Sequence, residues 1–269
     1  MRKVFVLAAV AIALFPSVSC LAQESDFSGW FSVGLEKKIV SGLSLEAEGE
    51  YRTCDHFSRT DRWGAGLSLT YRVYRNESKT FDIKTAVGAK YLKSYYPGEI
   101  TLKDMDHGFQ EYNSKPDYNV DKFRATASVA ASQKLGRFKI SLRERYQYTG
   151  NDSVCIIESK WRYDKHTGGL EERETEEDWK ARNNRRHSFR SRLQISFDTP
   201  SFFIDPYVSA ELCNDLKDNF RVQKVRYLFG LDCELAKSHD IKLYYMYQNH
   251  ADEDEPGGHV IGLSYCFEF

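Results

Sequence analysis

Apolar and polar residues alternate at every second position along most of this chain. Residues 42–53 are the clearest example, because on an extended strand Leu43 and Leu45 share one face while the glutamates share the other. A helix would scatter these glutamates around its axis, so the spacing predicts a strand. Ten further segments show the same alternation and are expected to be strands: 30–38, 62–73, 81–91, 123–131, 138–148, 189–197, 202–212, 225–235, 241–247 and 259–269.

Residues 1–22 have the composition of a secretory signal peptide. Arg2 and Lys3 precede an unbroken apolar run at 4–15, which is too short to span a bilayer as a stable helix. Small residues follow, and we expect cleavage after Ala22. We therefore expect residues 23–269 to form the folded protein, as a single domain.

The charge balance of residues 23–269 excludes one class of partner. Without Arg2 and Lys3, 36 basic and 39 acidic residues remain. A nucleic-acid-binding protein would carry a basic footprint, so none is expected here. The sequence also has no second apolar run long enough for a transmembrane helix. Only helices and closed barrels satisfy all backbone polar groups in lipid, so a membrane-spanning form would be a β-barrel.

The final strand, 259–269, carries aromatic residues at alternate positions. Tyr265, Phe267 and Phe269 match the aromatic positions of the signal that the barrel-assembly machinery reads on outer-membrane proteins. Gly262 lies two residues further from the end than is usual for that signal. We expect this machinery to be a partner during biogenesis.

Connections between the expected strands alternate between short and long. Outer-membrane barrels have short periplasmic turns and longer extracellular loops. The longer connections are expected at 54–60, 95–120, 150–185, 214–219 and 250–258. Two of them, 95–120 and 150–185, are long enough to hold extended hairpins above the membrane.

These patterns predict an all-β fold: an up-and-down antiparallel transmembrane β-barrel of 10–12 strands. The strand count poses a problem, because eleven segments alternate and a bacterial barrel should have an even number with both ends periplasmic. Ten strands starting at Gly42 would leave 30–38 as an extra segment. Twelve strands, which we favour, would require one more.

Four short motifs extend this interpretation to a family. They are Phe27-Ser28-Gly29-Trp30, Glu48-Gly49-Glu50-Tyr51-Arg52, Arg186-His187-Ser188-Phe189-Arg190 and Gly262-Leu263-Ser264-Tyr265-Cys266-Phe267. Over roughly residues 25–269 the chain resembles the bacterial family called domain of unknown function 2490. The resemblance implies an outer-membrane β-barrel and supplies no catalytic residues.

Charged residues on the polar strand faces are predicted to meet inside the barrel. The expected lumen charge network is Glu46, Glu48, Glu50, Arg52, Arg62, Arg72, Arg143, Arg145, Arg190, Arg192, Lys224 and Arg226. We favour a salt-bridge network that plugs the lumen. The alternative is a small polar pore in which the arginine excess favours anions.

A His/Ser pair and an acidic segment suggest further functions, but less strongly. His187 and Ser188 suggest a lipid hydrolase, but adjacent residues of a strand point to opposite faces and no G-x-S-x-G element occurs. No catalytic residue, cofactor or metal site is therefore expected. The acidic segment 171–178, beside Lys180 and Arg182, would suit divalent-ion bridges to lipopolysaccharide, although a solvated loop is the favoured interpretation.

The cysteines indicate no disulfide framework. Residues 23–269 contain an odd number, five, with no C-x-x-C spacing. A single disulfide between two of the residues Cys54, Cys155 and Cys213 remains an alternative. Cys20 raises a lipoprotein alternative, but Ser17 stands where such a signal usually carries a Leu-like residue.

The sequence thus predicts an integral outer-membrane barrel with a structural, surface-binding or small-pore role. Its expected surroundings are outer-membrane lipids and lipopolysaccharide, and its oligomeric state stays open. Two alternatives remain: an outer-membrane lipid hydrolase or deacylase, and a soluble or lipid-anchored periplasmic barrel that binds an apolar ligand. In the latter, the apolar strand faces would point inward.

Overall fold

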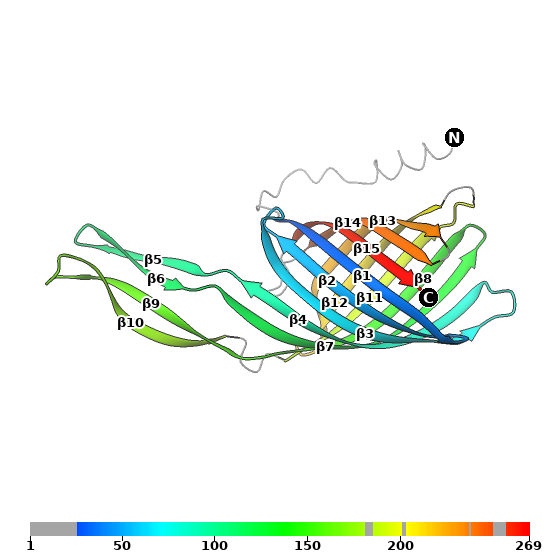
Figure 1. Cartoon of the computed structure of the whole chain (residues 1–269), viewed down its shortest axis with the longest axis horizontal. Coiled ribbons are helices and arrows are strands. Elements are labelled where there is room, and N and C mark those ends of the chain that lie inside the picture. The colour runs from blue at the N-terminus through cyan, green and yellow to red at the C-terminus, as the bar shows by residue number, and fades with distance from the viewer. Residues whose placement is uncertain (1–25, 181–184, 201–202, 237, 250–256) are drawn as a thin grey trace, which may run out of the picture.

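The computed structural model describes residues 26–180, 185–200, 203–236, 238–249 and 257–269. These residues form fifteen strands, eleven of which close into a barrel (Figure 1). No helix within the described ranges is long and apolar enough to cross a membrane. The barrel strands, in their order around the wall, are β1 (Asp26–Val40), β15 (Gly258–Glu268), β14 (His239–Asn249), β13 (Arg221–Ala236), β12 (Ile204–Asp215), β11 (Arg185–Phe197), β8 (Phe138–Asn151), β7 (Tyr118–Leu135), β4 (Phe81–Tyr96), β3 (Arg59–Arg75) and β2 (Leu43–Cys54).

All eleven segments predicted from alternation contain a barrel strand within the described residues, which confirms the predicted barrel class. Most strands run beyond the alternating segment: 123–131 lies within β7, and 62–73 lies within β3. The alternation reports only the part of a strand that has one continuous apolar face. The expected signal peptide, residues 1–22, and the lipidation candidate Cys20 lie outside the described residues.

The predicted even strand number is wrong. Residues 30–38 lie within β1, which pairs with β15 in parallel, from Asp26 opposite Gly258 to Glu36 opposite Glu268. When an odd number of strands run up and down in succession, the first and the last strand point in the same direction where the barrel closes. The parallel pairing of β1 with β15, which we call the seam, also satisfies the backbone N–H and C=O groups there. Neither the ten-strand nor the twelve-strand alternative is needed. Contacts across the seam include a hydrogen bond from Ser32 Oγ to Ser264 Oγ at 2.8 Å.

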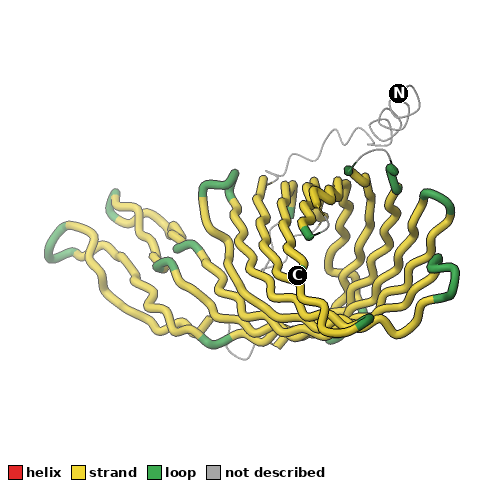
Figure 2. The backbone as a smooth tube through the Cα atoms, turned by 45° about the vertical axis from the view of Figure 1, so that its right-hand side comes forward, coloured by secondary structure: helices red, strands yellow, loops and turns green. Residues whose placement is uncertain are grey.

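The two long insertions form hairpins, as predicted. β5 (Glu99–Asp106) pairs with β6 (Phe109–Lys115), and β9 (Val154–Asp164) pairs with β10 (Gly169–Lys180). β6 also pairs with β9, so the hairpins make one four-stranded sheet. This sheet projects beyond one end of the barrel, at the left of Figure 1, and Figure 2 shows the same extension. We call this end the hairpin end and the opposite one the turn end.

The predicted sorting of connections by length is only partly correct. At the hairpin end, the connections 55–58 and 216–220 are no longer than the turn 76–80 at the turn end. Both shorten because their flanking strands extend further than the alternation indicates. Tight turning at 55–58 places Asp55, His56 and Phe57 in the left-handed backbone region. Because the strand number is odd, β1 begins at the hairpin end while β15 ends at the turn end.

The outer wall of the barrel is apolar. Val33 is 57% exposed and Leu142 is 48% exposed, although both lie in the middle of long strands. Other outward apolar residues are Phe31, Leu35, Leu45, Leu67, Leu69, Val87, Val129, Ile140, Leu193, Ile195, Val208, Leu212, Phe229, Leu243, Ile261 and Leu263. The carboxylate of Glu144 lies within this band, and it accepts a 2.6 Å hydrogen bond from Ser191 Oγ.

Aromatic side chains gather toward both ends of the outer wall. At the hairpin end Trp63 packs edge-on against Tyr91 and donates from Nε1 to Tyr95 Oη at 3.0 Å. At the turn end Phe138 packs against Phe197 with ring centroids 5.2 Å apart. Aromatic residues in these positions are typical of the girdles that flank the apolar band of a membrane barrel.

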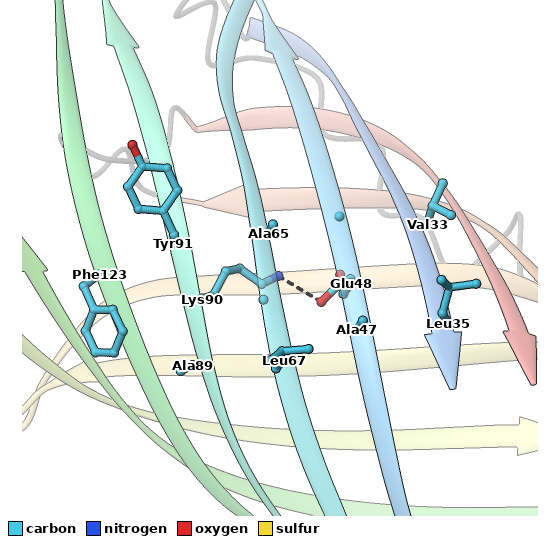
Figure 3. Close-up of a pocket in the computed structure, with 12 residues that line it drawn as sticks. Val33, Leu35, Ala47, Glu48, Ala65, Leu67, Ala89, Lys90, Tyr91 and Phe123 are labelled. Atoms are coloured by element: carbon cyan, nitrogen blue, oxygen red, sulfur yellow. Dashed lines mark hydrogen bonds and ion pairs between the residues drawn. The ribbon is translucent and has the colours of Figure 1, made fainter. Parts of the chain in front are cut away.

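A shallow apolar hollow of about 640 Å³ interrupts the outer wall across β1–β4 and β7 (Figure 3). Small side chains at Ala47, Ala65 and Ala89 form its floor between bulkier neighbours. Lys90 and Glu48, whose ion pair Figure 3 marks, also line the lumen on the other side of this wall. The hollow is therefore a thin part of the wall.

Candidate functional site

The polar faces of the strands point into the barrel and enclose a cavity of about 450 Å³. Nine basic and three acidic residues of the described chain line this cavity. Nine of the twelve residues in the predicted charge network are among its lining: Glu46, Glu48, Glu50, Arg52, Arg143, Arg145, Arg190, Arg192 and Arg226. These nine side chains therefore share the lumen face of the barrel wall.

One wall of the cavity is an acidic row on β2. Glu50 accepts hydrogen bonds from Lys90 Nζ at 2.6 Å and from Arg62 Nε at 3.1 Å, with Arg52 Nε at 3.4 Å. Glu48 lies 2.9 Å from Lys90 Nζ. The period of two brings alternate glutamates to one face, and β3 and β4 supply their cations from neighbouring registers.

The facing wall is basic and is organised around Glu211 of β12. Glu211 is 2% exposed, and guanidinium groups surround its carboxylate. Oε2 accepts from Arg192 Nε at 2.9 Å and lies 3.4 Å from Arg143 Nη2. Oε1 accepts from Arg226 Nη1 at 3.0 Å and from Arg190 Nε at 3.1 Å. Four arginines from three strands thus share a single carboxylate.

The remaining predicted network residues lie outside the cavity lining. Arg62 is fully buried and bonds Glu50 from behind the acidic row. Lys224 is buried on β13, two residues before Arg226. Arg72 lies near the turn end, where its backbone N–H donates to the Gly42 carbonyl at 2.7 Å.

Sequence reasoning missed two central members of the network, Glu211 and Lys90. Glu211 alternates with the outward residues Val208, Ala210 and Leu212, so the same period-two argument would have placed it in the lumen. Its role as the shared counterion could not be found in this way, because that role depends on the order of β8, β11, β12 and β13 around the barrel.

The lumen is filled toward the hairpin end. Arg62, Lys122, Glu211, Arg226 and Gln248 all belong to the lumen side of the strands near that end, yet each is at most 3% exposed. Side chains that point into a lumen are this inaccessible only when they pack against one another. Arg226 Nε donates to Gln248 Oε1 at 2.6 Å as part of this packing.

The lumen is more open toward the turn end. Lys139 and Lys242 are exposed there, and Glu46 is partly exposed. The cavity is consequently a vestibule that opens at the turn end and closes at the hairpin end.

The other predicted constellations are separated by the fold. Ser188 is buried on the lumen side, while His187 lies on the outer wall with Nδ1 2.7 Å from Tyr146 Oη. The aromatic residues of the final strand face outward, where Tyr265 Oη lies 2.8 Å from His239 Nδ1 and Phe267 stacks on Phe269. Side chains 173–180 of the acidic segment, and residues 181–184, lie outside the description. None of the five described cysteines forms a disulfide.

Comparisons with solved structures return distant β-barrel proteins. The NanC porin is 10% identical, with 87% of this chain and 94% of that chain covered and a TM-score of 0.45. The translocator domain of the autotransporter NalP from Neisseria meningitidis is 11% identical, with 79% and 70% covered and a TM-score of 0.42. The beta domain of the Bordetella autotransporter BrkA is 13% identical, with 85% and 82% covered and a TM-score of 0.41. These scores lie below 0.5, so the fold assignment stands on the strand pairing of the chain itself.

The sequence comparisons identify a family for this chain. No curated protein matches the sequence. A family match covers residues 27–256, which is most of the chain. The predicted family is thereby confirmed, although the motif at residues 262–267 lies beyond the match, and the chain belongs to the family described as Protein of unknown function (DUF2490).

Proposed function

We propose that this chain is an integral outer-membrane β-barrel with a lumen closed at rest by its charge network, and that it presents the hairpin sheet at the cell surface. The observation that carries the proposal is the direction of the two strand faces. Apolar side chains such as Val33 and Leu142 are exposed on the outer wall, while charged side chains line the cavity. Lipid can solvate such an outer wall, whereas water cannot do so without cost.

The same observation argues against a soluble barrel that holds an apolar ligand. That alternative needs apolar side chains around the cavity, and the cavity lining instead includes nine basic and three acidic residues. Glu144 is compatible with the membrane proposal, because its hydrogen bond from Ser191 lowers the cost of a carboxylate on the lipid side.

The proposed orientation follows from the two barrel ends. Long extensions of outer-membrane barrels lie outside the cell, so the sheet of β5, β6, β9 and β10 would face the medium. Exposed Glu171 and Glu172 on β10 would then lie above the lipopolysaccharide layer. The vestibule would open to the periplasm.

Membrane extraction and gel migration test the proposal. Carbonate-washed outer membranes should retain the full chain, and unheated protein should migrate differently from boiled protein because the closed barrel resists detergent. Release by carbonate together with unchanged migration would contradict an integral barrel.

A small anion-selective pore is the second candidate, favoured by the excess of arginine around the cavity. Planar-bilayer recordings of refolded protein separate the two functions. The closed-lumen proposal expects no stable conductance, since Arg226, Glu211 and Gln248 fill the hairpin end of the lumen. Steady anion-selective steps in the current would support the pore and contradict the closed lumen.

A further inference from the structure

Two pairs of arginines oppose each other directly across neighbouring strands of the lumen wall. Arg145 of β8 is the register partner of Arg190 of β11, and Arg143 is the partner of Arg192. Like charges directly opposite each other destabilise an antiparallel pair. A block of four guanidinium groups therefore needs compensating negative charge.

Glu211 supplies only part of that charge. Both of its oxygens are already occupied by Arg190, Arg192, Arg143 and Arg226. Among the described residues, neither Nε of Arg143 nor Nε of Arg145 has a hydrogen-bond partner, although both atoms are buried. Buried donors without acceptors are costly, and this cost is larger for charged groups.

The acidic row on the facing wall does not supply the missing negative charge. Glu48 and Glu50 are both engaged by Lys90, and Glu50 also by Arg52 and Arg62. The cavity lining as a whole carries nine basic residues against three acidic ones. The arginine block thus faces a space of about 450 Å³ with an uncompensated positive charge.

We propose that this cavity binds a small solute through a phosphate group, held by Arg143, Arg145, Arg190 and Arg192. Guanidinium groups match phosphate oxygens in geometry, and a dianion neutralises two of the opposed charges at once. A cavity of this size suits a phosphorylated small molecule. This inference rests on the proposed function, because the vestibule must open at the periplasmic end for the solute to enter.

The test uses full-length mature protein refolded in zwitterionic detergent and checked for heat-modifiable migration. Calorimetric titration with inorganic phosphate, and separately with glucose 6-phosphate, in chloride buffer of matched ionic strength measures binding. Saturable binding of either probe is expected, and the tighter of the two shows whether free phosphate or a phosphorylated solute is the ligand. Absence of binding by both probes would overturn the site.

The variant Arg145→Gln distinguishes a binding site from a structural plug. Removing one opposed charge should raise the thermal unfolding temperature in phosphate-free chloride buffer, and it should weaken phosphate binding by about tenfold or more. Lys139→Gln is the matched control, since it removes one positive charge from the same strand outside the cavity lining and should leave phosphate affinity nearly unchanged. A lower unfolding temperature for Arg145→Gln, with unaltered phosphate affinity, would show that the arginines serve packing alone.

The experiments distinguish failure of the proposed membrane barrel from failure of the phosphate site. A protein that folds only in the absence of detergent would overturn the membrane barrel and the inference with it. A heat-modifiable barrel that does not bind inorganic phosphate or glucose 6-phosphate would overturn the anion site alone.

Discussion

The phenol ring of Tyr244 on β14 lies directly over Gly262 on β15, on the lumen side of the wall. A Cβ added at Gly262 would lie 1.9 Å from Tyr244 Cζ, a distance that no packed structure tolerates. Tyr207 covers Gly230 in the same way, where an added Cβ would lie 2.4 Å from the ring. Because Tyr207, Gly230, Tyr244 and Gly262 follow one another across register-paired strands, the two rings fill the space that the two glycines leave open.

Gly262→Ala should therefore destabilise the barrel. Displacing the Tyr244 ring into a packed lumen is expected to cost about 1–3 kcal/mol, as overpacking does elsewhere. The midpoint of urea-induced unfolding of refolded protein measures the effect. Gly49→Ala is the matched control, since nothing lies within 4 Å of a Cβ built at that position. Equal midpoints for the two variants would contradict the packing of Tyr244 on Gly262.

Glu211→Gln should destabilise the barrel more strongly. The substitution keeps the shape of the side chain but leaves four arginines without their shared carboxylate, and breaking a buried ion pair in this way costs about 3–5 kcal/mol. Glu48→Gln provides the comparison, because Glu48 is 37% exposed and its partner Lys90 keeps Glu50. The same unfolding assay checks both variants. A Glu211→Gln barrel as stable as Glu48→Gln would show that the arginines do not depend on Glu211.

The sequence predicted the strands and their two faces because alternation is a local property. It also predicted the hairpins, since 95–120 and 150–185 are too long for simple turns. It did not predict the parallel seam between β1 and β15, because the direction of closure depends on the complete strand count. The role of Glu211 could not be predicted either, because its arginines lie up to 68 residues away in the sequence and meet Glu211 only in the closed barrel.

Surface labelling of Cys155 should report the orientation of the barrel. Cys155 is exposed on β9 in the hairpin sheet, whereas Cys54 and Cys213 are buried. A membrane-impermeant maleimide added to intact cells should label the wild type and should not label Cys155→Ser. A denatured, unreduced protein that comprises residues 23–269 should likewise titrate as five thiols. Labelling that appears only after the outer membrane is opened would place the hairpin sheet in the periplasm.

Replacing Phe269 should impair assembly without changing the folded barrel. Phe269 is 59% exposed and contacts mainly Phe267 and the Lys37 ammonium, so its removal costs little folded-state packing. If the barrel-assembly machinery reads the final aromatic residues, Phe269→Ala should lower the amount of barrel in outer membranes while detergent refolding stays normal. Leu263→Ala, at an outward position of β15 further from the C-terminal residue, serves as the control. Normal membrane levels of Phe269→Ala would remove Phe269 from the proposed signal.

The central claim is that the apolar strand face contacts lipid and the charged face lines the lumen. Nitroxide labels placed one at a time at positions 125–130 of β7, in a chain whose cysteines are replaced by serine, test it most directly. After reconstitution into lipid vesicles, oxygen should collide frequently with labels at 125, 127 and 129 and rarely with labels at 126, 128 and 130, since Val129 faces outward and Thr126 lines the cavity. The opposite phase, or collision rates with no alternation, would contradict the membrane barrel.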